Sequence, residues 1–222
     1  KDGSDYGCKF SYLTQTHPNG IAEAFLIGKN FINNSNVTLI LGDNIFYSPS
    51  TLFNFNKDIS GAHIFAYHVS NPQRYGVVEF NKENEVISIE EKPRNPKSNF
   101  AIPGLYIFDS SVVSNVENLT PSSRGELEIT DLLGKYLKSN TLKITKMDKG
   151  TAWLDTGTFS SLMQASQFVQ VLEKRQGLKV GCIEETAYKM GYINSKKLKI
   201  LAKRTLSSGY GKYLISLVDE KK

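Results

Sequence analysis

The chain has 222 residues, of which 40% are hydrophobic and 22% are charged, and its formal net charge is +5. This length suits one domain, because single hydrophobic cores stop growing near about 250–300 residues. The apolar content excludes a disordered chain. No apolar run approaches the ~20 residues of a membrane helix, and no signal-peptide pattern opens the sequence. We therefore expect a cytoplasmic protein that has no membrane partner.

Charge and cysteine usage narrow the function classes further. Lys and Arg are spread thinly and only 196–204 is locally basic, so no nucleic acid partner is expected. A mild positive balance equally suits small anionic substrates such as nucleotides. Cys8 and Cys182 lie far apart without partners at metal-ligand spacing, which excludes a disulfide framework and a zinc site. The opening 1–7 is a charged loop without Met, so we expect a truncated N-terminus.

Short apolar runs bounded by turn residues predict the strands of a sheet. The run 37–41 shows no alternation, which is typical of a strand buried on both faces of a parallel sheet. The stretch 76–91 instead resembles a hairpin with a polar turn, so the sheet is expected to be mixed. The predicted strands lie at about 9–15, 36–42, 61–69, 76–80, 86–91, 100–108 and 142–147.

Helical spacing of apolar residues predicts a crossover helix over 20–32 and further helices over 129–137, 158–176 and 183–218. The alternation of strands and helices indicates an α/β fold. We predict a Rossmann-like mixed, mainly parallel sheet flanked by helices, with a small antiparallel hairpin region and a C-terminal helical part. Residues 1–157 are the expected core, and residues 158–222 are expected to form a helical region of the same domain.

Two aspartates stand where an α/β sheet binds ligands. The segment LILGDN at 39–44 delivers Asp43 to the carboxyl end of a strand, which is the edge at which open sheets bind ligands. The segment AWLDTGT at 152–158 places Asp155 before the start of a helix. A carboxylate in such a position suits Mg²⁺ as a hard oxygen ligand. Each aspartate is also explained as a loop or helix cap, so neither motif decides alone.

The loop TQTHPNGIAEA at 14–24 joins a predicted strand to a predicted helix. The Gln15 amide can both donate to and accept from a base edge, and the helix start near Gly20 suits a polar ligand. A turn without any ligand is the alternative. His17 is interpreted as a bystander, since histidines in surface loops rarely act as bases.

A further candidate is EEKP at 90–93, at the end of a predicted strand. Glu91 can hydrogen-bond sugar hydroxyls and Lys92 can hold a phosphate, although Glu-Lys pairs are also common on exposed surfaces. The sequence contains no glycine-rich phosphate loop and no nucleophilic Ser or Cys motif. We therefore expect part of a nucleotide enzyme to be missing from it.

Taken together, seven ordered motifs resemble the glucose-1-phosphate thymidylyltransferase family. They are QTHPNGIAEAF, LGDNIFY, FAYHVSNPQRYGVVEF, EEKPRNPKSNFAIPGLY, SSRGELEITD, AWLDTGT and EKRQGLK. The resemblance implies a cytoplasmic homotetramer that joins dTTP to glucose 1-phosphate, releases pyrophosphate and makes dTDP-glucose for pathways such as dTDP-rhamnose biosynthesis. It also implies Mg²⁺ as cofactor.

The resemblance also implies roles for single residues. Asp43 and Asp155 are expected to hold Mg²⁺, Lys92 to hold the attacking phosphate, and Gln15 and Gly20 to contact thymine. The residues expected around the glucose and its phosphate are Tyr75, Gly76, Glu91, Lys92, Ile102 and Gly104, with Trp153 either lining that pocket or packing in the core.

Departures from the family pattern leave alternatives open. The family's opening unit carries a Gly-Gly-x-Gly-Thr-Arg-Leu loop that grips the triphosphate, and these 222 residues, including the core 1–157, lack it, so the chain as given is expected to be inactive alone. Thr16 and His17 replace the usual Pro and Ser, and the loop after Tyr47 looks short. The alternatives are a non-catalytic sugar-nucleotide-binding module and a transferase with another base or sugar preference. A metal-dependent glycosyltransferase is disfavoured, because 43–46 lacks the Asp-x-Asp motif.

Overall fold

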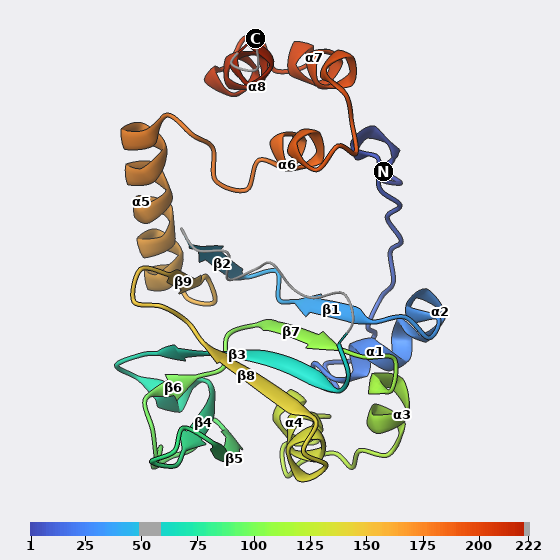
Figure 1. The fold of residues 1–222 in the computed structure, drawn as a ribbon, viewed down its shortest axis with the longest axis vertical. Helices are drawn as coiled ribbons and strands as arrows, with labels where there is room; N and C mark the ends of the chain where they lie inside the picture. Colours follow the sequence, from blue (N-terminus) through green and yellow to red (C-terminus); the bar gives the residue numbers. More distant parts are fainter. Residues whose placement is uncertain (49–58, 220–222) are drawn as a thin grey trace. The chain divides into compact units, whose positions relative to one another are not determined.

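The structure, a computed structural model, describes residues 1–48 and 59–219. The loop after Tyr47 therefore lies mostly outside the described residues. The chain forms two compact units, one of Leu13–Thr158 and one that joins Lys1–Tyr12 to Phe159–Lys222. Figure 1 labels the helices and strands of both units.

The larger unit is built on a mixed sheet with the strand order β1-β7-β3-β6-β4-β5, in which β8 also pairs with β3, and on a separate ribbon of β2 and β9. The strands are β1 (Val37–Ile40), β2 (Asn44–Tyr47), β3 (Ala62–His68), β4 (Gly76–Phe80), β5 (Val86–Glu91), β6 (Phe100–Ala101), β7 (Leu105–Phe108), β8 (Leu142–Lys146) and β9 (Ala152–Asp155). Its helices are α1 (Glu23–Ile27), α2 (Lys29–Ile32), α3 (Val112–Glu117) and α4 (Ile129–Lys138), with a 3-10 turn at Pro72–Arg74.

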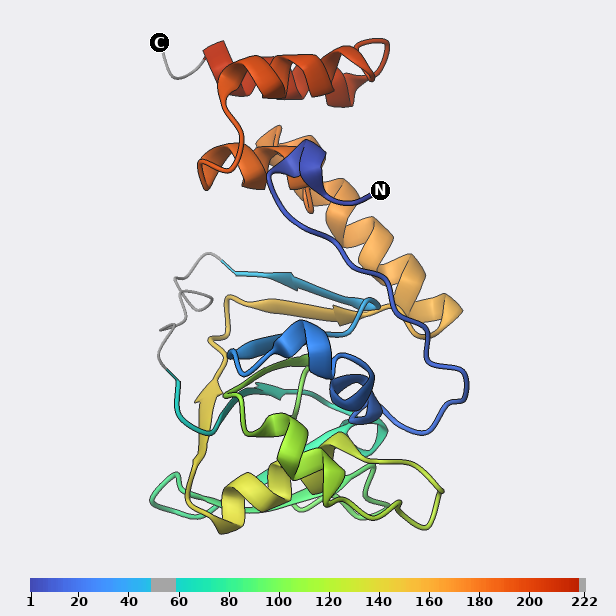
Figure 2. The same ribbon diagram turned by 90° about the vertical axis from the view of Figure 1, so that its right-hand side faces the viewer.

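The main core lies between the sheet and the helices α1, α3 and α4, which pack on one of its faces (Figure 1, Figure 2). Phe25 of α1 meets Phe108 of β7 edge to face at 5.1 Å between ring centroids, and Leu132 and Leu133 of α4 are fully buried. A smaller cluster around Phe65 of β3 covers the opposite face. Each fully buried aliphatic side chain contributes about 1.5–3 kcal/mol, so these clusters hold the unit together.

The α/β class and the mixed sheet flanked by helices are confirmed, but the expected preponderance of parallel pairs is wrong. Among the described strands, β3 and β8 form the one parallel pair, and the other pairs are antiparallel. The run 37–41 is not buried on both faces, because β1 ends the strand order and Ile40 is 56% exposed. A continuous apolar run does not by itself distinguish a central strand from an edge strand.

Two further predicted strands differ from the structure, and the predicted hairpin agrees with it. The predicted strand 9–15 makes no strand pair within the described residues, and its side chains are exposed, because apolar alternation forms a strand only with a partner ladder. The expected strand 100–108 is divided into β6 and β7 by Pro103, which has no backbone N–H to donate. The hairpin 76–91 is confirmed as β4 and β5, with Asn84 in the left-handed conformation at its turn.

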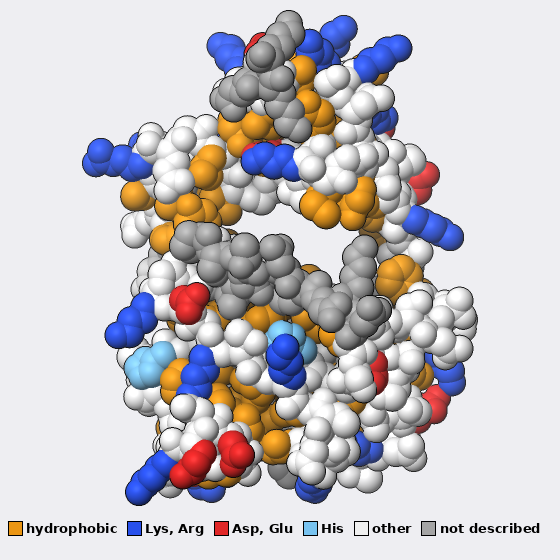
Figure 3. All heavy atoms as spheres, viewed as in Figure 1, with side chains coloured by type: hydrophobic (Ala, Val, Ile, Leu, Met, Phe, Trp, Pro, Cys, Tyr) orange, Lys and Arg blue, Asp and Glu red, His pale blue; other side chains and the backbone are white. Residues whose placement is uncertain are grey.

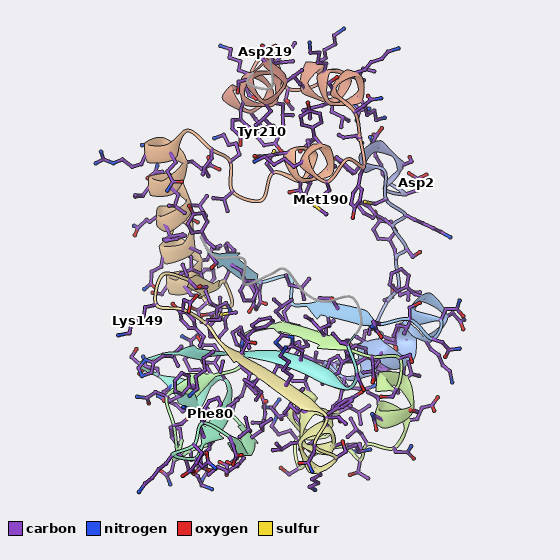
Figure 4. All side chains as sticks on the ribbon, in the orientation of Figure 1. Asp2, Phe80, Lys149, Met190, Tyr210 and Asp219 are labelled. Carbon is purple, nitrogen blue, oxygen red and sulfur yellow. The ribbon has the colours of Figure 1, made fainter. Side chains whose placement is uncertain are left out.

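The smaller unit consists of helices and the first residues of the chain. Its elements are a 3-10 turn (Ser4–Tyr6), α5 (Phe159–Gln176), α6 (Ile183–Lys189), α7 (Ser195–Lys203) and α8 (Gly209–Asp219). Leu198 and Leu214 lie in its core, and Tyr210 of α8 points toward α6, where its hydroxyl lies 3.2 Å from the Cys182 sulfur (Figure 4). The predicted stretch 183–218 is thus helical with breaks, one of them at Gly191, whose φ is +76°.

Ion pairs attach the first residues to these helices. The Asp5 carboxylate accepts from Lys197 Nζ at 2.7 Å and from Arg204 Nη1 at 2.9 Å. Residues 1–12 therefore group with the C-terminal helices and not with the sheet, so the division differs from the expected 1–157 and 158–222.

No helix within the described ranges has the length and apolar character needed to cross a membrane. Lys and Arg side chains are scattered over the face seen in Figure 3.

Candidate active site

The ribbon of β2 and β9 brings the two aspartates together. The strands are antiparallel, and Asn44 of β2 stands directly opposite Asp155 of β9. Asp43 precedes Asn44, and its carbonyl accepts from the Thr156 backbone N–H at 2.8 Å and from the Thr156 hydroxyl at 3.0 Å. Two carboxylates that lie far apart in the sequence thus become neighbours through four-residue strands that no local pattern predicted.

The carboxylate groups of this pair also face the same space. A Cβ atom at Gly157 would stand 3.7 Å from Oδ2 of Asp155 and 3.7 Å from Oδ2 of Asp43, so the two oxygens are at most about twice that distance apart. A side chain at Gly157 would therefore touch both carboxylates at ordinary van der Waals distance, so the glycine of the Thr-Gly-Thr turn lies beside the pair.

Both aspartates line a pocket of about 330 Å³ in the larger unit. Most of the predicted site residues line it as well. A larger groove of about 670 Å³ lies between β5 and α4, but none of the predicted site residues lines that groove. The pocket is formed by Ile21, Leu41, Asp43, Asn44, Arg74, Tyr75, Gly76, Glu91, Lys92, Ile102, Gly104, Tyr106, Ile129, Thr130, Trp153, Asp155 and Gly157.

Two donors that directly precede β4 hold Asp155. The Tyr75 hydroxyl donates to Oδ1 at 2.8 Å, and Nη2 of Arg74 donates to Oδ2 at 3.2 Å. Burial raises the pKa of Tyr75 to about 12, and the hydrogen bond to the carboxylate adds to this shift. Tyr75 therefore remains a protonated donor at neutral pH, and the Tyr75 bond fixes the orientation of the Asp155 carboxylate.

Asn44 connects the aspartates to the opposite wall of the pocket. Its side-chain oxygen accepts from the Gly104 backbone N–H at 3.0 Å and from Trp153 Nε1 at 2.6 Å. Its Nδ2 donates to Oδ1 of Asp43 at 2.7 Å. Because the indole and the backbone can only donate here, the amide has one orientation that satisfies all three bonds. Trp153 is thereby a fixed wall of the pocket.

β5 ends at Glu91, and Lys92 directly follows it; both residues line the pocket. Burial raises the pKa of Glu91, and the nearby Glu128 raises it further, while the Lys92 ammonium opposes the shift. Lys92 Nζ lies 3.7 Å from Glu91 Oε1. The Lys92 backbone has φ +43°, and its N–H donates to the Tyr75 carbonyl at 3.1 Å. A lysine with a left-handed backbone conformation is uncommon, and residues in such conformations cluster at ligand sites.

The glycines of the pocket leave space that a side chain would fill. A Cβ at Gly76 would stand 2.9 Å from Cγ2 of Thr130 and 3.5 Å from both Oε2 of Glu91 and Cδ1 of Ile102. A Cβ at Gly104 would overlap the Leu41 side chain at 2.7 Å. A side chain at Gly76 would therefore crowd Thr130 and touch Glu91 and Ile102, while one at Gly104 would have to displace Leu41.

Gln15 and Gly20 lie outside this pocket. Nε2 of Gln15 donates to the Gly20 carbonyl at 3.1 Å and to Oε2 of Glu23 at 2.6 Å. Gly20 has φ +102°, and a Cβ there would collide with the Leu127 carbonyl oxygen at 2.4 Å. The structure brings the two residues together in one loop, and their contact with a base stays a prediction.

Sequence reasoning missed several residues that the pocket contains. Arg74 and Thr130 stand inside the motifs RYGVVEF and ELEITD, and Asn44 and Gly157 each adjoin or lie near an aspartate. Thr130 is buried in the pocket wall, and its hydroxyl lies close enough to Glu91 to lower the pKa of that carboxyl. The sequence feature that could have identified these residues is their position next to predicted site residues.

The two carboxylates suit a magnesium ion whose remaining coordination positions are filled by water and substrate. Across residues 1–48 and 59–219, no group of three or more His, Cys, Asp or Glu side chains could hold a metal ion. Mg²⁺ is usually bound by one or two carboxylates, with water and substrate phosphates as its other ligands. Asp43 and Asp155, with Oδ2 of each facing one space, match this partial set of ligands.

Comparisons with known sequences agree with this arrangement. Residues 1–171 match the sequence family described as nucleotidyl transferase. The chain is 50% identical over 220 residues to the glucose-1-phosphate thymidylyltransferase of Mycolicibacterium smegmatis, covering 98% of this chain and 76% of the relative. It is 48% identical to the enzyme of that name from Neisseria meningitidis, with the same coverage of both chains.

Comparisons with solved structures give the same assignment. The fold matches a crystal structure of a Bacillus anthracis protein assigned as a glucose-1-phosphate thymidylyltransferase, in complex with sucrose, with a TM-score of 0.68 and 38% identity. The match covers 75% of this chain and 68% of that one. A UDP-glucose pyrophosphorylase structure at 24% identity shares the fold with a TM-score of 0.63. This chain therefore belongs to the glucose-1-phosphate thymidylyltransferase family of nucleotidyl transferases.

Proposed function

We propose that the protein transfers a thymidylyl group from dTTP to glucose 1-phosphate, forming dTDP-glucose and pyrophosphate. The observation that carries this proposal is the pair Asp43 and Asp155, which face one space in a pocket shared with Glu91 and Lys92. The 50% identity to a relative named for this reaction supports the choice of substrates.

The chemistry is a single in-line displacement, in which a phosphate oxygen of glucose 1-phosphate attacks the α-phosphorus of dTTP and pyrophosphate leaves. Such a transfer needs little covalent work from the protein, so positioning and charge neutralisation carry the rate. Asp43 and Asp155 would hold Mg²⁺, which when bound neutralises the charge that gathers at the reacting phosphates. Lys92 holds the attacking phosphate, and Tyr75 keeps the Asp155 carboxylate in place.

The sugar side of the pocket is assigned to the wall opposite the aspartates. Glu91 accepts from glucose hydroxyls, while the glycines at 76 and 104 leave room for the ring. Ile102 and Trp153 supply apolar surface against the faces of the sugar. The indole N–H of Trp153 is taken by Asn44, so its ring contributes shape and not a polar contact.

For the base we propose that Gln15 and Gly20 contact thymine. An amide side chain matches the donor and acceptor pattern of a pyrimidine edge. Because Gln15 now donates to Glu23, it would have to exchange that partner for the base. Replacing Gln15 by Ala should then raise the KM for dTTP and leave the KM for glucose 1-phosphate unchanged.

We further propose a cytoplasmic homotetramer whose product enters deoxysugar pathways such as dTDP-rhamnose biosynthesis. The family resemblance supports this assignment. The exposed apolar side chains Leu162, Met163 and Val171 on α5 also suit a contact between copies. Light scattering on the purified protein should give about four times the chain mass, and a monomer at all concentrations would contradict the proposal.

Pyrophosphate release from dTTP and glucose 1-phosphate tests the activity. Turnover should require a divalent cation and should be lost when Asp43 is replaced by Asn. Replacement of Asp131, which is exposed on α4 and lies outside the pocket, should leave it unchanged. Cation-independent turnover, or an active Asp43→Asn variant, would contradict the proposal.

A second candidate is recognition of a sugar nucleotide without turnover, which the lack of a glycine-rich phosphate loop in the 222-residue sequence favours. The isolated chain should then bind dTDP-glucose in calorimetry and release no pyrophosphate. Turnover by the isolated chain would exclude this candidate.

A further inference from the structure

The two oxygens of the Asp155 carboxylate are held in different ways. Oδ1 accepts from the neutral Tyr75 hydroxyl at 2.8 Å, whereas Oδ2 accepts from the charged Arg74 guanidinium at 3.2 Å. The Tyr75 bond is therefore compatible with a cation beside the carboxylate, while the Arg74 bond adds a positive charge to it.

Oδ2 is also the oxygen of Asp155 that lies near the same point beside Gly157 as an oxygen of Asp43. It stands 3.7 Å from the Cβ position of Gly157, and Oδ2 of Asp43 stands 3.7 Å from the same point. A cation shared by both aspartates would use the oxygen that Arg74 now occupies. Two positive groups on one oxygen lie about 3–5 Å apart, a separation at which like charges repel strongly in a partly buried site.

Arg74 is placed so that it can leave this oxygen. Its side chain is 47% exposed, against 20% for Asp155, and its guanidinium lies over the Tyr75 ring at 5.4 Å from the centroid. Ion pairs this exposed contribute little to stability, so exchanging the partner costs little. Arg74 also lines the pocket together with Lys92, within which a substrate phosphate is proposed to lie.

We propose that Arg74 is an exchangeable counter-ion of Asp155, which gives up Oδ2 to a divalent cation and then binds a phosphate of the substrate. The inference rests on the proposed metal role of Asp43 and Asp155. By linkage, a phosphate that draws Arg74 away raises the affinity for the cation, and the cation raises the affinity for the phosphate by the same factor.

The test is cation binding and does not depend on turnover. Mn²⁺ binding is followed by electron paramagnetic resonance, and Mg²⁺ binding by the fluorescence of Trp153, the one tryptophan of the sequence, whose ring lies 4.9 Å from that of Tyr75. Arg74→Gln should bind Mn²⁺ roughly three- to ten-fold more tightly than the wild type, and Arg74→Lys should stay near it. Equal or weaker binding by Arg74→Gln would overturn the inference.

Two further variants separate this inference from the metal site itself. Arg204→Gln removes another Asp-bound arginine, 2.9 Å from Asp5 in the smaller unit, and should leave Mn²⁺ binding unchanged. Asp155→Asn should weaken binding at least ten-fold. If the wild type and Asp155→Asn bind Mn²⁺ equally, the proposed metal role is wrong. If Asp155→Asn binds more weakly but Arg74→Gln binds like the wild type, the metal role stands and the proposed exchange of Arg74 is wrong.

Glucose 1-phosphate supplies the decisive comparison, because a merely structural arginine would not couple two ligands. In the wild type, saturating glucose 1-phosphate should tighten Mn²⁺ binding by roughly three-fold or more, and in Arg74→Gln this gain should disappear. The same gain in both proteins would show that Arg74 does not exchange between carboxylate and phosphate.

Discussion

Trp153 donates its indole N–H to the side-chain oxygen of Asn44 at 2.6 Å, across the ribbon formed by β2 and β9. The same Asn44 side chain donates to Asp43 and accepts from the Gly104 backbone. One amide thus joins the acidic wall of the pocket, its aromatic wall and the glycine at the sugar side. Changes at Asn44 are expected to affect all three.

Replacing Asn44 by Ala should lower kcat/KM by about 10- to 100-fold, the range typical of residues that orient metal ligands. The free energy of unfolding should fall by about 1–3 kcal/mol, because the Trp153 and Gly104 donors lose their acceptor. Steady-state kinetics and urea unfolding measure both effects. Asn30→Ala, at an exposed position on α2, is the matched control and should change neither. Wild-type kinetics in Asn44→Ala would refute its positioning role.

Asp155→Asn keeps the shape of the side chain and removes its charge. We expect kcat to fall by on the order of 10²–10³, because an electrostatic contact to the transition state is lost. The fold should persist, since Tyr75 and Arg74 still find an acceptor at this position. Near-normal turnover in a pyrophosphate-release assay, with Asp131→Asn run in parallel, would rule out a metal-holding role.

Glu91 makes stability depend on pH in a direction that can be checked. Its pKa is raised above the ordinary glutamate value of 4.5, mainly by burial, so the folded state binds the Glu91 proton more tightly than the unfolded state does. Stability conferred by this residue is therefore greatest at low pH and falls as pH rises from about 4.5 through the folded pKa.

Glu91→Gln cannot ionise, so its free energy of unfolding should rise relative to the wild type between pH 4 and pH 7, while its KM for glucose 1-phosphate increases. Urea unfolding at both pH values measures the first effect. Glu90→Gln, at the neighbouring exposed position of β5, is the control. A constant difference between wild type and Glu91→Gln at the two pH values would contradict the prediction.

Two glycine-to-alanine changes form a matched pair. Gly76→Ala places a Cβ 2.9 Å from Thr130 Cγ2, so it should cost about 1–3 kcal/mol of stability through overcrowding and raise the KM for glucose 1-phosphate. Gly134→Ala, within α4, meets no atom within 4 Å and should stabilise the protein by about 0.5–1 kcal/mol. Thermal unfolding and kinetics would show both, and equal effects of the two changes would refute the steric argument.

Local patterns in the sequence were sufficient for the elements that depend on near neighbours. The hairpin of β4 and β5 followed from two β-rich runs around a polar turn, and α4 from one apolar face behind an acidic start. The ordered motifs also indicated the family and most of the pocket residues. These features depend on backbone propensity and side-chain periodicity, which a window of ten to twenty residues contains.

Only the tertiary structure decided which residues meet. The pairing of Asn44 with Asp155 joins two four-residue strands, too short to show a period, and the Arg74 bond to Oδ2 of Asp155 depends on the same pairing. Local patterns in the sequence likewise did not predict that β1 is an antiparallel strand at the end of the strand order, or that Asp5 docks on α7. Such contacts are chosen by burial and hydrogen bonding between distant segments, so no local pattern encodes them. The sequence identified the two aspartates as candidate metal ligands, but only the fold brings their carboxylates to the same pocket.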